Sequence, residues 1–147
     1  MSQERCLIVD GHSIIHAWPD LRALHQGPER RRARQELVRV LEVYADAVGQ
    51  HVVVVFDGTQ AKTQADEQAD RIQVFYSAAH RTADDVIERL VGKYAAEMEI
   101  SVASDDGMVR QTVSALDAFW LSSGGLQTEI DRAERVLRDR LDRLRRS

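Results

Sequence analysis

Three short apolar runs that each end in aspartate constrain the fold of this chain more than any other feature. The runs are CLIV before Asp10, HVVVVF before Asp57 and EISVA before Ser104-Asp105-Asp106, and a glycine follows the aspartate in each case. Apolar runs of this length, stopped by turn residues, indicate buried β-strands. The aspartates are therefore predicted at the carboxyl ends of strands, where side chains emerge at the edge of a sheet.

Helical patterns separate the predicted strands. Strands are predicted at about 5–10, 51–56, 72–76, 100–103 and 118–121, and helices at about 28–48, 82–98, 108–116 and 126–145, with a shorter helix interrupted near Pro19. Strands that alternate with helices form a parallel sheet, because right-handed crossovers return the chain to the same edge. The expected fold is a three-layer α/β protein with a mainly parallel sheet of four to five strands.

Length and composition indicate one ordinary globular domain over residues 1–147. The chain is 44% hydrophobic and 30% charged, which excludes a disordered protein. A net charge of -4 gives no overall attraction to nucleic acid, so any such binding must depend on local basic patches. The single cysteine, Cys6, excludes an internal disulfide or a cysteine zinc site. No apolar stretch is long enough for a membrane span, so a cytoplasmic protein is expected.

The aspartates are expected to meet at one edge of the sheet. Asp10, Asp57 and either Asp105 or Asp106 end parallel strands, and Asp84 begins a helix on the same side. Carboxylates gathered in this way repel each other by several kcal/mol unless protons or a cation relieve the repulsion. An oxygen-only set favours Mg²⁺ or Mn²⁺ over zinc, and such an ion supports phosphodiester hydrolysis.

Each aspartate also has a structural explanation. Asp-Gly after a strand is common turn chemistry, and carboxylates are stabilised in the first turn of a helix. Thr82 and Asp85 form a variant of the helix capping box, which explains Asp85 better than Asp84. These explanations do not account for the occurrence of aspartates after four of the predicted strands, Asp84 being the one at the start of the following helix. The functional hypothesis depends on that repeated occurrence.

Several basic residues are candidates for contact with a nucleic-acid backbone. A basic run at a helix start is usually a solvated face, but it opposes the helix dipole, and phosphate binding is the alternative explanation. The arginine-rich helix at about 126–146 is expected to be solvated, although its last arginines lack acidic partners. His12, His16 and His25 show no ligand spacing and are interpreted as turn or surface residues. The candidates for contact with the phosphates of the nucleic-acid backbone are Arg30, Arg31, Arg32, Arg34, Lys62, Arg71 and Arg81.

Four motifs together resemble a known family. They are LIVDGHSIIHAWPDL, VVVVFDG, RTADDVIERL and VASDDG, and their order and spacing are similar to those of YacP-type NYN-domain proteins in the PIN-like nuclease superfamily. The resemblance covers about residues 5–140. It implies a Rossmann-like PIN fold and an endoribonuclease dependent on Mg²⁺ or Mn²⁺. The chain departs from the family at His12-Ser13, where an aromatic residue and asparagine are usual.

The resemblance also implies roles for individual residues. Asp10, Asp84 and Asp106 match the ligands of the divalent ion, with Asp105 as a close alternative to Asp106. Asp57 is expected among the ligands or beside them, and Ser13 and Thr82 are expected to orient water or phosphate.

The function expected from this evidence is internal cleavage of single-stranded RNA, with mRNA, including mRNA on the ribosome, as one candidate substrate. The alternative is an RNA- or ribosome-binding module on the same fold with weak catalysis. An aspartyl-phosphate enzyme ranks below both, because no lysine follows Lys93.

Overall fold

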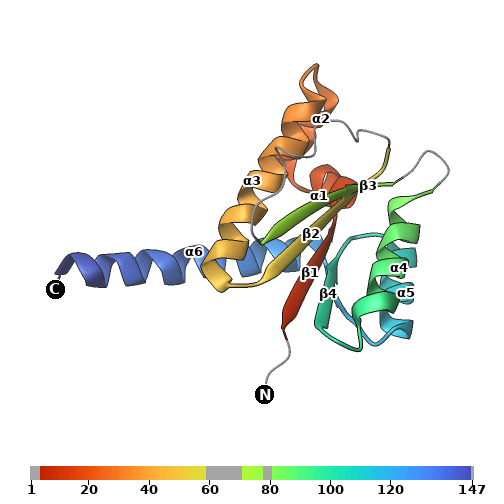
Figure 1. The fold of residues 1–147 in the computed structure, drawn as a ribbon. Helices are drawn as coiled ribbons and strands as arrows, with labels where there is room; N and C mark the ends of the chain where they lie inside the picture. The colour runs from red at the N-terminus through yellow and green to blue at the C-terminus, as the bar shows by residue number, and fades with distance from the viewer. Residues whose placement is uncertain (1–3, 59–70, 78–80, 147) are drawn as a thin grey trace.

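The protein folds around a five-stranded parallel sheet with the strand order β3-β2-β1-β4-β5. The computed structural model describes residues 4–58, 71–77 and 81–146. In chain order its elements are β1 (Arg5–Asp10), α1 (Gly11–Ala17), α2 (Pro19–Gln26), α3 (Arg30–Val48), β2 (His51–Phe56), β3 (Ile72–Tyr76), α4 (Ala83–Tyr94), β4 (Glu99–Ala103), α5 (Gly107–Ala115), β5 (Phe119–Leu121) and α6 (Ser123–Arg146). The predicted α/β architecture with a parallel sheet is confirmed (Figure 1).

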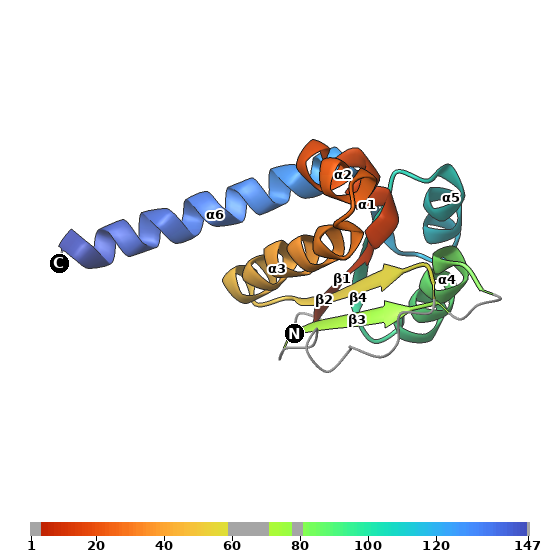
Figure 2. The same cartoon turned by 90° about the horizontal axis from the view of Figure 1, so that it is seen from above.

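Alternate residues of β1 point into two separate cores, one on each side of the sheet. Leu7 and Val9 belong to the core formed with α1, α2, α3 and the start of α6. Cys6 and Ile8 belong to the core formed with α4 and α5. This alternation, expected for a strand buried on both faces, produces three layers (Figure 2).

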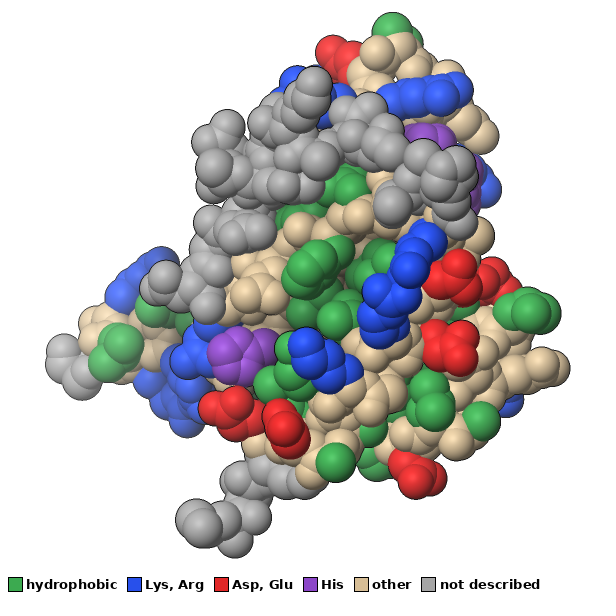
Figure 3. Space-filling view, turned by 45° about the vertical axis from the view of Figure 1, so that its right-hand side comes forward, with side chains coloured by type: hydrophobic (Ala, Val, Ile, Leu, Met, Phe, Trp, Pro, Cys, Tyr) green, Lys and Arg blue, Asp and Glu red, His purple; other side chains and the backbone are tan. Residues whose placement is uncertain are grey.

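The face of the sheet beside β3 is less covered than the four consecutive valines of β2 suggested. Val52, Val54 and Val55 are fully buried, but Val53 is only half-buried. Val53 and Phe75 line a groove of about 400 Å³ on the side of the sheet that α4 covers only in part. Hydrophobic side chains are visible near the middle of this face in Figure 3. β2, which the sequence predicted as a buried strand, is therefore only partly covered on this face.

Helix α6 begins three residues earlier than predicted. The helix starts at Ser123, so Gly124 and Gly125 lie in its first turn instead of in a preceding loop. A Cβ at Gly125 would lie 2.8 Å from Leu121 Cδ1, so the glycine permits the close turn between β5 and α6. Leu126 and Ile130 pack in the core, and the rest of α6 extends away from the body of the molecule (Figures 1 and 2).

The order in which successive strands are added to the sheet changes side at β1. The chain runs outward from β1 to β2 and β3, and then crosses back to place β4 on the other side of β1. The carboxyl ends of two neighbouring strands separate at such a switch point, and α/β proteins bind their ligands in that crevice. Asp10 ends β1, and Ser104, Asp105 and Asp106 follow β4.

Candidate active site at the carboxyl ends of the strands

A pocket of about 580 Å³ opens at this switch point. The end of β1, helix α1, the end of β2, the start of α4 and the turn between β4 and α5 all contribute to its wall. Its lining residues are Asp10, His12, Ser13, His16, Ala17, Asp57, Thr82, Asp84, Asp105 and Asp106. The structure therefore brings together the five aspartates that the sequence analysis singled out, together with Ser13 and Thr82.

Asp10 is the most buried carboxylate of the pocket, with 5% of its surface exposed. Its pKa is raised from 3.8 to about 6, mainly by burial and also by the nearby charges of Asp84 and Asp57. A hydrogen bond from Ser104 Oγ to Asp10 Oδ2, 2.7 Å long, acts in the opposite direction. The raised pKa shows that several negative charges share a desolvated site.

Ser104 connects two of the aspartates and was missed by the sequence analysis. Its side chain is fully buried, and its hydroxyl donates to Asp10 while it accepts from the Asp106 backbone N–H at 3.1 Å. Its carbonyl accepts a hydrogen bond of 2.8 Å from Trp120 Nε1. The sequence signal for this role was a serine between the end of a strand and a pair of aspartates, but only the aspartates of that motif were considered as site residues.

Asp84 and Asp106 both line the pocket, close enough for the charge of Asp106 to act on Asp84. Burial raises the pKa of Asp84, and the negative charges of Asp106, Asp57 and Asp85 raise it further. No hydrogen bond holds the Asp84 carboxylate within the described part of the chain. Asp106 caps α5 through one oxygen, Oδ1, which accepts from the Met108 N–H at 2.9 Å. Each of these residues keeps at least one carboxylate oxygen for a ligand.

Asp57 and Asp105 are held by the backbone of other elements. Asp57 Oδ1 accepts from the Ala83 N–H at the start of α4, at 2.6 Å. Asp105 Oδ1 accepts from the Ser123 N–H and Oδ2 from the Ser123 hydroxyl, at 2.8 and 2.6 Å. Both oxygens of Asp105 are therefore engaged by Ser123, the first residue of α6, which favours Asp106 over Asp105 as a ligand residue.

Ser13 joins α1 to the turn after β4. Its Oγ accepts a hydrogen bond of 2.8 Å from the Asp105 backbone N–H. This contact uses the hydroxyl as an acceptor and leaves its hydrogen available to donate into the pocket. Thr82 is arranged similarly, because its Oγ1 accepts from the Asp85 N–H in the capping box at the start of α4.

The predicted basic residues divide into three groups. Arg30, Arg31, Arg32 and Arg34 begin α3, whose first turn contains no acidic residue, and Arg81 precedes α4 on the pocket side of the sheet. Arg71 precedes β3 and therefore lies at the opposite edge, where the parallel strands begin, so it is not part of the group around the pocket. Lys62 lies outside the described residues.

The pocket offers the chemistry of a hard divalent cation, although its carboxylates do not form a closed cage. No three His, Cys, Asp or Glu side chains among residues 4–58, 71–77 and 81–146 converge closely enough to hold an ion by themselves. Mg²⁺ usually keeps several waters and takes only one or two carboxylates together with substrate phosphates. Burial, and then the charges of neighbouring carboxylates, raise the pKa values of Asp10 and Asp84, and a bound cation would offset both effects. The donor set therefore fits a hydrated Mg²⁺ or Mn²⁺ ion.

Comparisons with known proteins find similar sequences and similar folds. The chain is 29% identical over 140 residues to the uncharacterized protein YacP of Bacillus subtilis strain 168, which covers 94% of this chain and 82% of that protein. A crystal structure of a mutant of Rae1 (YacP) from Bacillus subtilis superposes with a TM-score of 0.80 at 28% identity, covering 97% of this chain and 84% of that one.

A more distant likeness concerns the fold alone. A T5 5′-exonuclease mutant matches with a TM-score of 0.54 at 14% identity, covering 82% of this chain and 50% of that one.

No helix in the described part of the chain is both long and apolar enough to cross a membrane. The family model for the YacP-like NYN domain matches residues 7–147, and this chain therefore belongs to the YacP-like NYN domain family, with a PIN-like nuclease fold.

Proposed function

We propose that this protein is a divalent-metal-dependent endoribonuclease that hydrolyses phosphodiester bonds in single-stranded RNA. One observation carries the proposal: five aspartates from four separate segments of the chain surround one pocket at the switch point of a PIN-like sheet. Such an edge is where α/β proteins bind ligands, and a group of carboxylates there suits a cation and the phosphate it binds. The membership of the family, whose fold is that of a nuclease, supports the same conclusion.

Within this proposal, Asp10, Asp84 and Asp106 hold Mg²⁺ or Mn²⁺. Asp57, which follows β2 and accepts a hydrogen bond from the start of α4, supports them, and Asp105 has a structural role because it binds the first residue of α6. The ion, when bound, supplies an activated water and stabilises charge on the leaving oxygen. Ser104 orients Asp10, and the hydroxyls of Ser13 and Thr82 donate hydrogen bonds to a phosphate oxygen or to water.

The RNA backbone would be held by the basic residues beside the pocket. Arg30, Arg31, Arg32 and Arg34 extend along the first turns of α3, and Arg81 lies at the start of α4. Contacts of this kind bind phosphates without selecting a sequence. An mRNA in the cytoplasm, free or on a ribosome, is the first substrate to test.

A cleavage assay on unstructured RNA with Mn²⁺ tests the proposal. We expect internal cleavage of a circular single-stranded RNA, which has no ends for an exonuclease. Asp10→Asn and Asp84→Asn should each lower the rate by at least about 100-fold, because each removes a proposed ligand of the ion. Asp46→Asn is the matched control, since Asp46 is an exposed residue of α3 far from the pocket lining.

Equal product from the parent and from Asp10→Asn would overturn the mechanism. RNA binding without cleavage by the parent would instead support the binding module. The observation that favours this alternative is Ser13, which lies where the family usually has asparagine and is partly engaged by the Asp105 backbone.

A further inference from the structure

Three histidines form a cluster of rings at one side of the carboxylate pocket. His12 and His16 lie one helical turn apart on α1 and both line the pocket, whereas His25 comes from the last turn of α2. The ring of His25 packs edge-on against both others, at centroid distances of 5.9 Å to His12 and 5.0 Å to His16. The sequence analysis treated these residues as separate, but the turn between α1 and α2 brings them together.

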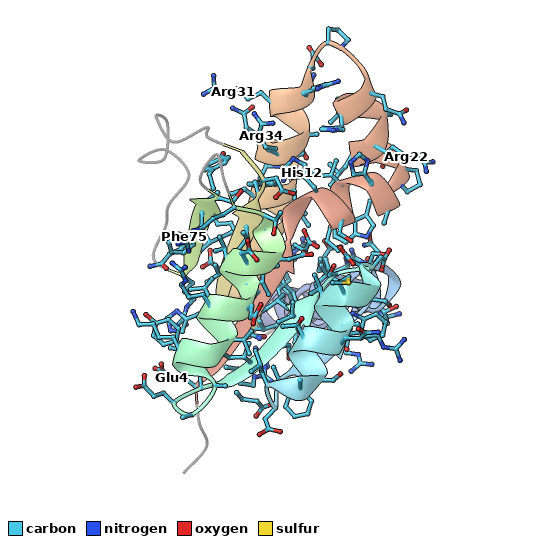
Figure 4. All side chains as sticks on the ribbon, turned by 90° about the vertical axis from the view of Figure 1, so that its right-hand side faces the viewer. Glu4, His12, Arg22, Arg31, Arg34 and Phe75 are labelled. Carbon is cyan, nitrogen blue, oxygen red and sulfur yellow. The ribbon has the colours of Figure 1, made fainter. Side chains whose placement is uncertain are left out.

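Two arginines of α3 lie close to the same cluster. The positive charges of Arg30 and Arg34 lower the pKa of His25, in addition to the larger effect of burial, and the charge of Arg34 also lowers the pKa of His12. In Figure 4, Arg34 lies between Arg31 and His12. Within the described ranges, neither Arg30 nor Arg34 has an acidic partner, whereas Arg32 pairs with Glu29 at 3.2 Å. The guanidinium of Arg34 is therefore available to an anion beside the pocket.

The imidazoles of the cluster also have unused hydrogen-bonding atoms. The Nδ1 atom of His12 accepts from the Asp57 backbone N–H at 3.2 Å, so its neutral ring carries the hydrogen on Nε2. The Nδ1 atom of His25 is buried and has no hydrogen-bond partner in the part of the chain that the structure describes. Unpaired polar atoms of this kind are costly in a folded protein unless a ligand satisfies them. The ring of His16 is exposed at the rim of the pocket.

We infer that His16, His25 and Arg34 form a subsite for the nucleic-acid phosphate next to the bond that is cut. The inference rests on the proposed function, and it specifies the course of the bound RNA strand. The RNA leaves the carboxylate pocket across the corner of α1 and α2 and continues toward the first turn of α3. Arg34 contributes a charged donor to the phosphate, and the imidazoles contribute N–H donors and ring faces.

The opposite exit from the pocket is less suitable for an anionic strand. On that side Arg81 and Arg89 share a shallow pocket with Asp85 and Glu88, so acidic and basic charges alternate. The corner of α1, α2 and α3 contains histidine and arginine without a described acidic partner at Arg30 or Arg34. Purple histidine and blue basic side chains lie side by side at the upper edge of Figure 3. Charge complementarity therefore selects the α1–α3 side.

Binding of a labelled single-stranded oligonucleotide, measured by fluorescence anisotropy in an Asp10→Asn background, tests this inference without any cleavage. We expect the His16→Ala/His25→Ala double variant to raise Kd about tenfold. Arg34→Ala should raise Kd about fivefold and reduce the salt dependence of log Kd by about 0.7, the value for one phosphate contact to a single strand. Arg34→Lys keeps the charge and should retain most of the affinity.

Two variants serve as controls, and a third tests the alternative exit. His51→Ala removes an exposed histidine at the opposite edge of the sheet, and Arg39→Ala removes an exposed arginine of α3 that pairs with Glu36. Both should leave Kd unchanged. Arg81→Ala tests the rival exit over α4. Thermal unfolding followed by circular dichroism identifies misfolded variants, and His16→Gln/His25→Gln replaces the double alanine variant if it does not fold.

The inference is overturned if the histidine and Arg34 variants bind as tightly as the parent, and a loss of affinity in Arg81→Ala alone would place the bound strand over α4 instead. A protein that binds no single-stranded oligonucleotide, RNA or DNA, overturns it as well. Its failure is separate from that of the nuclease proposal, because binding is measured without cleavage. If the parent cleaves no RNA but the histidine and Arg34 variants lose affinity, the subsite stands and the enzymatic activity does not.

Discussion

The Asp10 carboxylate links the stability of the fold to the chemistry of the pocket. Its pKa in the folded protein, about 6, lies above the ordinary value of 3.8. The folded state therefore holds the Asp10 proton more tightly than the unfolded state does. The resulting stabilisation is fully present below about pH 4 and is lost as the pH rises through about 6. The rise in pKa corresponds to about 3 kcal/mol.

Asp10→Asn should therefore stabilise the metal-free protein at neutral pH. The amide can still accept from Ser104, and it removes a buried charge that Asp84 and Asp57 repel. We expect the free energy of unfolding to rise by about 1–3 kcal/mol at pH 7, with no gain near pH 4. Urea unfolding in the presence of EDTA measures the difference. A variant less stable than the parent at pH 7 would contradict this electrostatic account.

Gly11 is required by a close contact immediately behind the pocket. A Cβ at this position would lie 2.3 Å from Phe56 Cε1, and the Phe56 ring is fully buried. Gly11→Ala should therefore destabilise the protein by about 1–3 kcal/mol through overpacking. Gly92 in α4 provides the matched control, Gly92→Ala, because no atom lies within 4 Å of the position that its Cβ would occupy.

The control should raise stability by up to about 1 kcal/mol, since alanine favours the helix. Chemical denaturation of both variants measures the contrast. Equal effects of the two substitutions on the free energy of unfolding would show that the contact with Phe56 does not exclude a Cβ at Gly11.

Some site residues could be predicted from the sequence and others could not. The aspartates could, because each follows an apolar run or begins a helix, so that local pattern and topology together place it at one edge. Ser104 and the three histidines could not, because their roles depend on tertiary contacts: Ser104 with Asp10, and His25 with His12 and His16. Arg71 directly precedes a strand whose bounds were predicted correctly, so its place at the edge where the parallel strands begin follows from the sequence together with the topology.

At the scale of the elements, the predicted strands and helices agree with the structure where the sequence carries its own boundary signal. Pro19 begins α2 at the predicted interruption, and the reciprocal Thr82–Asp85 capping box begins α4. The start of α6 was predicted too late, because Gly124 and Gly125 argue against a helix when only local propensity is considered. The Asp105 side chain, which caps this helix from the turn after β4, is not apparent from the local sequence.

The cap of α6 also distinguishes Asp105 from the proposed ligands. Asp105→Ala should lower the free energy of unfolding by about 1–2 kcal/mol, because the Ser123 N–H loses its acceptor. It should leave the rise in Tm on addition of Mn²⁺ intact. Asp84→Asn should do the opposite, with little loss of stability and no response to Mn²⁺. Thermal unfolding with and without Mn²⁺ checks both, and a lost Mn²⁺ response in Asp105→Ala would make Asp105 a ligand.

At the scale of the whole molecule, the order of the strands determines where the carboxylates meet. Because β4 returns to the side of β1 opposite β2, the ends of β1 and β4 separate, and the turns that follow them border one crevice. Helices α1 and α4 then close the crevice from the two layers, and each presents its first turn to the pocket. The same arrangement places the histidine cluster on one side of the pocket and the mixed charges of α4 on the other.

The central claim is that this crevice is a metal-dependent nuclease centre, and a crystal soaked in Mn²⁺ tests it most directly. Anomalous scattering identifies Mn²⁺ without reference to the protein model. We expect at least one Mn²⁺ peak bounded by Asp10, Asp84 and Asp106, with oxygen ligands at about 2 Å and water completing the coordination. The peak should be absent in crystals of Asp84→Asn. A soaked crystal of RNA-cleaving protein with no Mn²⁺ in this pocket, or with Mn²⁺ bound only elsewhere, would contradict the account.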